Sequence, residues 1–323
     1  MDDNITLLAD IGATNARFAL SVNHSCPDHL QVLQCADYPT PEDAINDYLE
    51  ARNIINLDHV CLAIAGPVIN DVVNVTNNHW VLDANKLKAR YKLKKILFLN
   101  DFEAIAYSIP QLTKEQFLSL SQRQAMVNQN DHFNYLILGA GSGLGVASLI
   151  KREETIFAIV SEGGHANFSP VTEVQIAIFN ILRNKHHQIS NEMLLSGPGI
   201  INIYQSLCEV EGVKQNYASA QQICEAANKS EDYICTKSQD VFFEILGQVA
   251  ADLTLTFRSF DGVYIAGGII QRYSGLITNS RFNECFESKS QHIQLLQNTP
   301  RFLITETHPG LMGAHYCSVM QTT

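Results

Sequence analysis

The feature that most restricts the fold of this chain is a pattern that occurs twice: an apolar run, a glycine turn with Thr or Ser, and an apolar return run. The first copy reads IGATNARFAL over residues 11–20, and the second reads AGSGLGVASL over residues 140–149. Each copy predicts a β-hairpin, because short apolar runs around a glycine turn are typical of paired strands. The copies share few identical residues, but an internally duplicated α/β fold would produce such a repeat.

Strands and helices alternate through the first hundred residues. Apolar runs predict strands at residues 5–9, 17–22, 31–35, 59–65 and 95–99. Helices are predicted at 41–52, where Thr40 suits the N-cap and Pro41 the first helical position, and at 82–91. The first three strands are typical of an antiparallel meander, and the later alternation indicates a parallel portion of the same α/β sheet.

A second unit begins near Phe133 and becomes mostly helical after Pro170. Strands are predicted at 135–138, 146–150, 157–160, 263–266 and 301–305, and helices at 172–186, 192–208, 219–228, 232–257 and 310–320. No linker or low-complexity tract separates the two halves. We therefore expect the halves to share a tight cleft, in a chain whose 323 residues suffice for two domains.

The composition and charge disfavour several classes of function. The formal net charge is -11, whereas nucleic acid or an anionic membrane as main partner would require a basic patch. No apolar run is long enough to predict a membrane-spanning segment. The eight cysteines are scattered without a C-x-x-C pair, and the chain begins Met-Asp-Asp-Asn without a basic region. We therefore expect a cytoplasmic protein with reduced thiols and no secretory signal.

Three glycine turns follow apolar strands, at residues 10–15, 139–145 and 267–268. Glycine suits a phosphate-binding turn because backbone N–H groups must approach anionic oxygens closely. Each turn alone could be an ordinary tight turn, and the three together favour phosphate binding. The second turn fails the dinucleotide motif G-x-G-x-x-G, because residue 144 is leucine and another strand follows. The P-loop and protein-kinase motifs are absent.

Polar residues follow two predicted strands at positions where α/β sheets bind ligands. Asn100 and Asp101 come directly after the strand at 95–99. Either residue could instead cap the helix that starts near Phe102, and one of them can act as the cap while the other binds ligand. Glu162 and His165 flank a Gly-Gly turn and suit hydroxyl recognition, because carboxylate and imidazole accept hydrogen bonds from polyols. His165 alone would be interpreted as a hydrogen-bonded loop histidine.

Six segments of the chain resemble, in order, the bacterial ATP-dependent glucokinase family. They are DIGATNAR (10–17), LNDF (99–102), GAGSGLGVA (139–147), EGGH (162–165), LSGPG (195–199) and IAGGI (265–269). The resemblance implies the hexokinase/actin/Hsp70 superfold, a duplicated ribonuclease-H-like α/β fold of two domains with ATP in a central cleft. It implies a small domain at 1–111 plus 307–323, a large domain at 112–306, and a homodimer.

The resemblance also implies transfer of the γ-phosphate of ATP to the C6 hydroxyl of glucose, giving glucose 6-phosphate. Asp101 matches the general base, and Asp10 matches the acid that holds Mg²⁺. The sugar-hydroxyl ligands match Asn100, Asp101, Glu162, His165 and Glu192. The ATP-binding residues match Asp10, Gly12, Ala13, Thr14, Asn15, Gly141, Ser142, Gly143, Gly267 and Gly268. A structural ion pair explains Arg17 about as well as a role at the first turn does.

The chain departs from the family pattern at a few positions. Ala13 stands where the family has a second glycine, and Ser142 replaces the usual threonine. The segment 256–262 carries Arg258 and Asp261, where the family is richer in glycine and carries asparagine. The C-x-C-G-x-x-G-C zinc motif of the related repressor and sugar-kinase group is absent, which argues against a zinc site.

Two alternative functions remain open from the sequence. A sister kinase for fructose, mannose or an amino sugar would keep the phosphate turns and change hydroxyl recognition around residues 162–192. A non-catalytic sugar sensor on the same superfold would lose the base or add a DNA-binding segment. The presence of Asp101 and the acidic net charge favour the enzyme.

Overall fold

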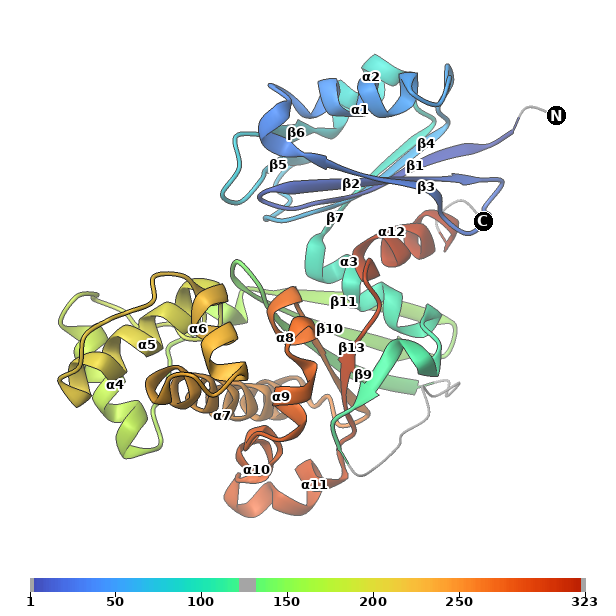
Figure 1. Cartoon of the computed structure of the whole chain (residues 1–323). Coiled ribbons are helices and arrows are strands. Elements are labelled where there is room, and N and C mark those ends of the chain that lie inside the picture. Colours follow the sequence, from blue (N-terminus) through green and yellow to red (C-terminus); the bar gives the residue numbers. More distant parts are fainter. Residues whose placement is uncertain (1–2, 122–131, 321–323) are drawn as a thin grey trace. The chain divides into compact units, whose positions relative to one another are not determined.

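The structure is a computed structural model that describes residues 3–121 and 132–320. The chain divides into two compact units (Figure 1). Unit 1 comprises Met1–Thr113 and Glu306–Thr323, and unit 2 comprises Lys114–Thr305. Each unit is built around its own mixed sheet, with helices that cover the sheet. The α/β class expected from the sequence is therefore confirmed.

The sheet of unit 1 has the strand order β3-β2-β1-β4-β7. These strands are β1 (Ile5–Ile11), β2 (Asn15–Val22), β3 (Asp28–Gln34), β4 (His59–Ile64) and β7 (Lys95–Asn100). The first three strands pair antiparallel, and β4 and β7 extend the sheet in parallel from β1, as predicted. The predicted start of the return strand at 17 was wrong: β2 begins at Asn15, because the turn takes up only Gly12–Thr14.

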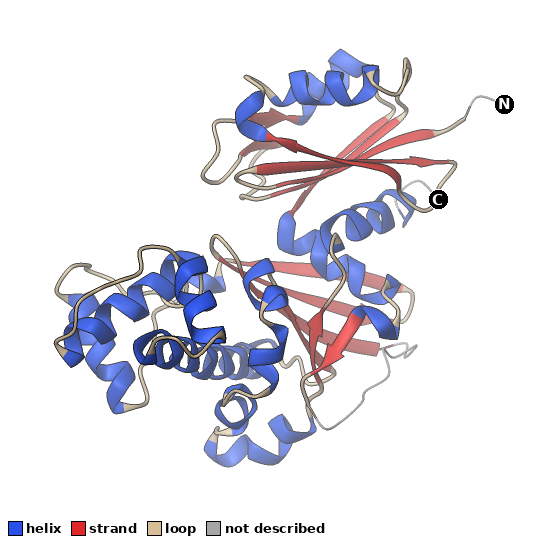
Figure 2. Ribbon diagram, in the orientation of Figure 1, coloured by secondary structure: helices blue, strands red, loops and turns tan. Residues whose placement is uncertain are grey.

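Helices cover both faces of the sheet of unit 1 (Figure 2). They are α1 (Pro41–Glu50) and α2 (Ala84–Tyr91) on one face, and α3 (Asp101–Ser108) and α12 (Pro309–Met320) on the other. Leu7 and Leu8 are adjacent in β1 and enter different core clusters, because successive side chains of a strand point to opposite faces. A sheet buried on both faces explains the continuous apolar runs of β1 and β4.

Side-chain caps set the starts of these helices. Thr40 accepts a hydrogen bond from Asp43 N and begins α1, as expected from the sequence. The predicted helix at 82–91 begins two residues later, because Asp83 is its N-cap and accepts from the N–H groups of Asn85 and Lys86. Residues 81–83 instead form β6 (Val81–Asp83), which pairs with β5 (Val72–Asn74). Short 3-10 helices at Cys35–Asp37 and Ile109–Gln111 complete unit 1.

The sheet of unit 2 has the strand order β11-β10-β9-β12-β13-β8. These strands are β9 (His132–Ala140), β10 (Leu144–Arg152), β11 (Thr155–Ser161), β12 (Gly262–Ala266), β13 (Arg301–Ile304) and β8 (Phe117–Ser119). β9, β10 and β11 pair antiparallel, and β12 and β13 continue in parallel from β9. These five strands repeat the order and directions of the five in unit 1. The short β8, which the sequence did not predict, adds an antiparallel edge.

The helices of unit 2 cluster around one long buried helix, α7 (Tyr233–Phe257). The others are α4 (Glu173–Arg183), α5 (Gly197–Glu211), α6 (Ala220–Asn228), α8 (Gly268–Arg272), α9 (Ser274–Thr278), α10 (Phe282–Glu287) and α11 (Ile293–Asn298), with 3-10 turns at Lys114–Gln116, Gly163–His165 and Ser290–His292. The predicted helix at 192–208 was wrong at its start: α5 begins at Gly197, because Ser196 caps it through a bond from Gly199 N. Glu192 therefore lies in the loop before α5.

The two unusual residues of segment 256–262 have structural roles. Arg258 ends α7 in the left-handed backbone region, with φ of 55°. The Asp261 carboxylate accepts a hydrogen bond from Asn134 N at 2.8 Å and so fastens the segment to β9. The Phe257 carbonyl accepts from the Asn134 side chain at 2.6 Å. This departure from the family pattern thus fixes the end of α7 against the sheet.

Two further findings concern cysteines and membranes. All eight cysteines are free thiols, and Cys26 is exposed while the other seven are buried. Within residues 3–121 and 132–320, no helix combines the length and the apolar character needed to cross a membrane.

Gly247 in α7 provides a stability test of the helical core. A Cβ at Gly247 would collide with the Phe282 carbonyl of α10, so Gly247→Ala forces backbone atoms apart. We expect the free energy of unfolding to fall by about 2–3 kcal/mol, measured by urea denaturation. Gly275→Ala in α9 is the matched control, because a Cβ there meets open space and alanine is the better helix former. Equal urea midpoints for the two variants would contradict this packing.

Candidate functional site

The first glycine turn, Gly12–Thr14 in unit 1, has its carbonyls bonded and two N–H groups free. The Asn78 side-chain amide donates to the Gly12 and Ala13 carbonyls at 3.3 and 3.1 Å. The Thr14 carbonyl accepts from Cys35 N at 2.9 Å. In the described ranges, no group accepts from the N–H of Ala13 or Thr14. Unpaired consecutive N–H groups form a concave site suited to an anion.

A cavity of about 560 Å³ lies against this turn. Its lining consists of Ala13, Thr14, Cys35, Ala36, Asn77, Asn78 and His79. Sequence reasoning missed Asn78, which orients the turn from 66 residues away along the chain. The polar run Asn77-Asn78-His79 contains no motif that indicates this contact.

Asp10 lies at the end of β1, beside the first turn of α12. Its register partner on β2 is Arg17, whose Nη1 lies 3.7 Å from Asp10 Oδ2. A Cβ on Gly310 would lie 3.0 Å from the Asp10 carboxyl carbon, so glycine lets the helix approach the acid. Burial raises the pKa of Asp10, and the nearby Arg17 and His308 lower it. Arg17 thus forms an ion pair with Asp10, which is one of the two interpretations that the sequence left open.

Asn100 and Asp101 share the junction between β7 and α3, and Asn100 is the cap. Asn100 Oδ1 accepts from Glu103 N at 3.4 Å, and Glu103 Oε2 accepts from Asn100 N at 3.2 Å, which together form a capping box. Asn100 Oδ1 also accepts from Phe102 N at 2.9 Å. The Asn100 amide also donates to the Gly66 carbonyl at 3.3 Å. Asp101 is the first residue of α3, and its Oδ1 accepts from Phe102 N at 3.0 Å. Asn100 is therefore the residue that caps, and Asp101 lies next to it.

Three of the predicted sugar ligands gather in unit 2. His165 Nε2 lies 3.9 Å from Glu162 Oε2, and His165 Nδ1 lies 3.9 Å from Glu192 Oε1. The Glu162 and His165 side chains are mostly exposed, whereas that of Glu192 is 32% exposed. Two carboxylates and an imidazole at one surface provide several hydrogen-bond acceptors for hydroxyl groups.

Backbone hydrogen bonds join the two loops that carry these ligands. Phe168 N donates to Ile189 O at 2.8 Å, Asn191 N to Ala166 O at 2.9 Å, and Glu192 N to Gly164 O at 2.9 Å. A Cβ on Gly164 would collide with the Leu144 carbonyl, so this loop passes directly against β10. The loops are thereby fixed to each other and to the β9–β10 hairpin.

The second glycine turn, Gly141–Gly143, adjoins this cluster. Gly141 N donates to Gly143 O at 2.8 Å, and Gly197 N at the start of α5 donates to Gly141 O at 2.8 Å. Leu144 N donates to Glu192 Oε2 at 2.9 Å. No acceptor in residues 3–121 or 132–320 bonds the N–H of Ser142 or Gly143. This turn therefore resembles the first one in offering two consecutive free donors.

The third turn, Gly267–Gly268, lies beside the second at the same edge of the sheet. Strands β12 and β9 run in parallel, with Ala266 opposite Gly139. Gly267 has φ of 109°, and a Cβ there would collide with the backbone of Ala140. Only glycine fits both requirements, and α8 begins directly after it.

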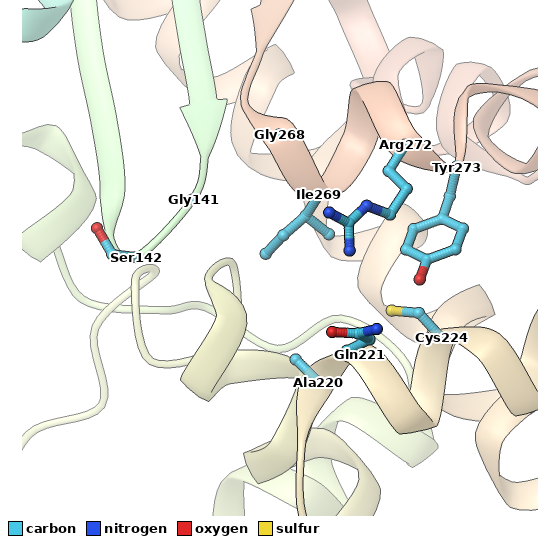
Figure 3. Close-up of a pocket in the computed structure, with 9 residues that line it drawn as sticks. All are labelled: Gly141, Ser142, Ala220, Gln221, Cys224, Gly268, Ile269, Arg272 and Tyr273. Carbon is cyan, nitrogen blue, oxygen red and sulfur yellow. The ribbon is translucent and has the colours of Figure 1, made fainter. Parts of the chain in front are cut away.

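A pocket of about 330 Å³ lies beside the second and third turns (Figure 3). Its lining consists of Gly141, Ser142, Ala220, Gln221, Cys224, Gly268, Ile269, Arg272 and Tyr273. Figure 3 shows Ile269, Arg272 and Tyr273 facing Gln221 and Cys224 of α6. Within the described chain, the buried Tyr273 hydroxyl has no hydrogen-bond partner. An apolar pocket with a few polar groups is typical of a small-molecule site.

The sequence predicted Gly268 at the start of α8 but did not predict the contribution of α6 to this pocket. Residues 219–228 were predicted as a helix, but helical periodicity indicates only which face is apolar. Ala220 and Gln221 lie nearly 80 residues from Gly141 along the chain, and no motif marks them. The predicted ATP residues Gly141, Ser142 and Gly268 do line the pocket.

Comparisons with known proteins give a consistent result. The family model described as Glucokinase matches residues 7–321. The chain is 36% identical over 309 residues to a glucokinase of Hahella chejuensis, and the match covers 95% of each chain. It is 37% identical over 316 residues to a glucokinase of Colwellia psychrerythraea, and that match covers 96% of this chain and 94% of the relative. The crystal structure of a glucokinase from an Antarctic psychrotroph has a TM-score of 0.86 and 32% identity, covering 97% of this chain and 98% of that one.

The capping role of Asn100 can be tested by stability. Asn100→Ala removes the acceptor for the first N–H groups of α3, so we expect the free energy of unfolding to fall by about 1–2 kcal/mol. Asn100→Ser restores a capping hydroxyl and should recover most of the loss in thermal or urea unfolding. If alanine and serine variants unfold alike, the side chain is not an energetically significant cap.

Proposed function

The chain belongs to the glucokinase family, whose reaction is the ATP-dependent phosphorylation of glucose, and we propose which of its residues perform that reaction. The observation that carries the assignment is the position of Glu162, His165 and Glu192. These side chains gather beside a glycine turn with two free N–H groups. Acceptors for sugar hydroxyls next to donors for phosphate oxygens are what a sugar kinase requires.

Asp101 is assigned as the general base. Its carboxylate accepts the proton of the glucose C6 hydroxyl while the C6 oxygen forms its bond to the γ-phosphorus. The bond from that phosphorus to the β–γ bridging oxygen breaks, and ADP leaves with the electron pair. The capping box at Asn100 supports this role, because it fixes the start of α3, where Asp101 lies. A well-positioned base of this kind contributes roughly 10²–10⁴-fold to the rate.

We assign the sugar hydroxyls to Asn100 and Asp101 of unit 1 and to Glu162, His165 and Glu192 of unit 2. The Asn100 amide has one hydrogen left after its bond to the Gly66 carbonyl, and this hydrogen can donate to a hydroxyl oxygen. The 3.9 Å separations of His165 from both glutamates leave these side chains available to hydroxyl groups.

ATP is bound by the glycine turns and by the pocket beside α6. The free N–H groups of residues 13–14 and 142–143 support assignment of Gly12, Ala13, Thr14, Asn15, Gly141, Ser142 and Gly143 to the phosphates. The pocket of about 330 Å³ next to Gly267 and Gly268 supports assignment of these glycines to the adenosine. Ile269 offers an apolar surface for the base, and the unpaired Tyr273 hydroxyl offers a hydrogen bond.

Asp10 fits the role of the acid that holds Mg²⁺. Mg²⁺ prefers oxygen ligands and is commonly bound by one or two carboxylates together with water and substrate phosphates. Gly310 leaves space beside the Asp10 carboxylate that a Cβ would fill. When bound, Mg²⁺ would neutralise charge on the phosphates.

We also propose the fold subtype, the domain boundaries, the oligomeric state and the location of the protein. The shared order of five strands in the two sheets supports a duplicated ribonuclease-H-like fold. We assign residues 1–111 plus 307–323 to the small domain and 112–306 to the large domain. We expect a homodimer from the family resemblance, and light scattering would test it by measuring the molar mass in solution. The eight free thiols support a cytoplasmic location.

Replacement of the base tests the assignment of Asp101. Asp101→Ala should lower kcat by about 10²-fold or more, while the affinity for glucose falls far less, because the base acts mainly on the transition state. Turnover is measured by coupled assay of ADP release, and glucose binding by calorimetry. Asp101→Asn keeps the shape of the side chain and should show the same loss of kcat. Retained turnover in both variants would place the base elsewhere.

Filling the pocket beside α6 tests the assignment of the adenosine site. Ala220→Trp places an indole in the pocket, so we expect KM for ATP to rise about tenfold or more while glucose affinity without nucleotide is unchanged. Ala218→Trp is the matched control, because Ala218 is exposed and outside the pocket lining. Equal KM values for ATP in the two variants would argue that the nucleoside binds elsewhere.

A further inference from the structure

The turn Gly141–Leu144 holds the carboxylate of Glu192 through its backbone. Leu144 N donates to Glu192 Oε2 at 2.9 Å, and His165 Nδ1 lies 3.9 Å from the other oxygen, Oε1. The backbone of Glu192 is fixed as well, because its N–H donates to the Gly164 carbonyl and its carbonyl accepts from the Ser196 hydroxyl. The orientation of this carboxylate is therefore set from both ends of the residue.

The carboxylate fits at this place only because residue 143 is glycine. A Cβ on Gly143 would lie 2.5 Å from Glu192 Oε2 and 3.3 Å from Glu192 Cδ. A Cβ on Gly141, two residues earlier in the same turn, would meet no atom within 4 Å. Neither glycine adopts a positive φ, so the backbone does not require glycine at either position. The requirement at Gly143 comes from the Glu192 side chain.

We propose that Gly143 and the N–H of Leu144 are positioning residues for the sugar, which fix the Glu192 carboxylate so that its Oε1 side receives a hydroxyl group. This inference rests on the proposed function, in which Glu192 binds glucose. The turn then serves both substrates. The N–H groups of Ser142 and Gly143 are free for phosphate, while the next N–H holds the sugar ligand.

Two alanine variants on the same turn test the proposal. Gly143→Ala should displace the Glu192 carboxylate and weaken glucose binding by about tenfold or more, because a hydrogen bond to a charged group is among the strong ones. Gly141→Ala should leave glucose affinity within about twofold of the unmodified chain. Glucose binding is measured by calorimetry without nucleotide, so effects on ATP do not enter. The thermal unfolding temperatures of the two variants should be similar, because the atoms that Gly143→Ala displaces are at the end of the flexible Glu192 side chain.

A series of monodeoxyglucoses separates positioning from general damage. Each deoxyglucose lacks one hydroxyl group, and its affinity is compared with that of glucose in the same variant. In Glu192→Ala, the loss of affinity should be smallest for the sugar that lacks the hydroxyl bound by Glu192, because that contact is already gone. The Gly143→Ala variant should give the same deoxyglucose profile as Glu192→Ala, since both act on one contact. Damage spread over the whole site would instead weaken every sugar by a similar factor.

The outcomes distinguish this inference from the function on which it rests. If Glu192→Ala weakens glucose binding while Gly143→Ala behaves like Gly141→Ala, the positioning role is overturned and the proposed function stands. A Gly143→Ala profile that differs from that of Glu192→Ala overturns it too. If Glu192→Ala leaves glucose affinity unchanged, the assignment of Glu192 to the sugar is itself overturned, and the positioning role falls with it.

Discussion

The polar groups of unit 2 depend on the backbone hydrogen bonds of one turn, Gly141–Leu144. Its first carbonyl accepts from Gly197 N at the start of α5, and its last N–H donates to Glu192. Buried backbone groups are nearly always hydrogen-bonded, and these bonds fix the hairpin, the loop and the helix in one arrangement. The adjacent loop closes onto β10 at Gly164, where a side chain would collide with the strand. The acceptors for hydroxyl groups and the free N–H donors are thereby held a few residues apart.

In unit 1, the starts of two helices, α3 and α12, fix the surroundings of the two acids Asp101 and Asp10. Asn100 satisfies the first N–H groups of α3 and so leaves Asp101 as the first residue of a helix whose position is set. The start of α12 approaches Asp10 closely, since residue 310 is glycine, and Arg17 on the neighbouring strand balances the charge of Asp10. Asp10 lies at the end of β1 and Asp101 directly follows β7 in the same sheet, and strand ends of this kind are where α/β folds present ligand-binding groups.

Much of this architecture could be predicted from local patterns, and the errors have physical causes. The strands around each glycine turn were predicted from runs of apolar residues, and the start of α1 was predicted from its N-cap Thr40. Both signals are local, because they depend only on neighbouring residues. The start of α5 was misplaced to residue 192, because the apolar spacing continues through the loop and the cap at Ser196 was not taken as the boundary. The pocket residues Gln221 and Tyr273 were not predicted, since their contact with the turns joins segments far apart in the chain.

By itself, the sequence determined the two hairpins, the three glycine turns and the acids that follow apolar strands, because each depends on residues that are neighbours along the chain. Only the tertiary structure decided what each polar group does: Asn100 caps a helix, Arg17 pairs with Asp10, and Glu192 binds the N–H of Leu144. The physical reason is that secondary structure follows from local periodicity and capping, whereas hydrogen-bond partners follow from the packing of distant segments.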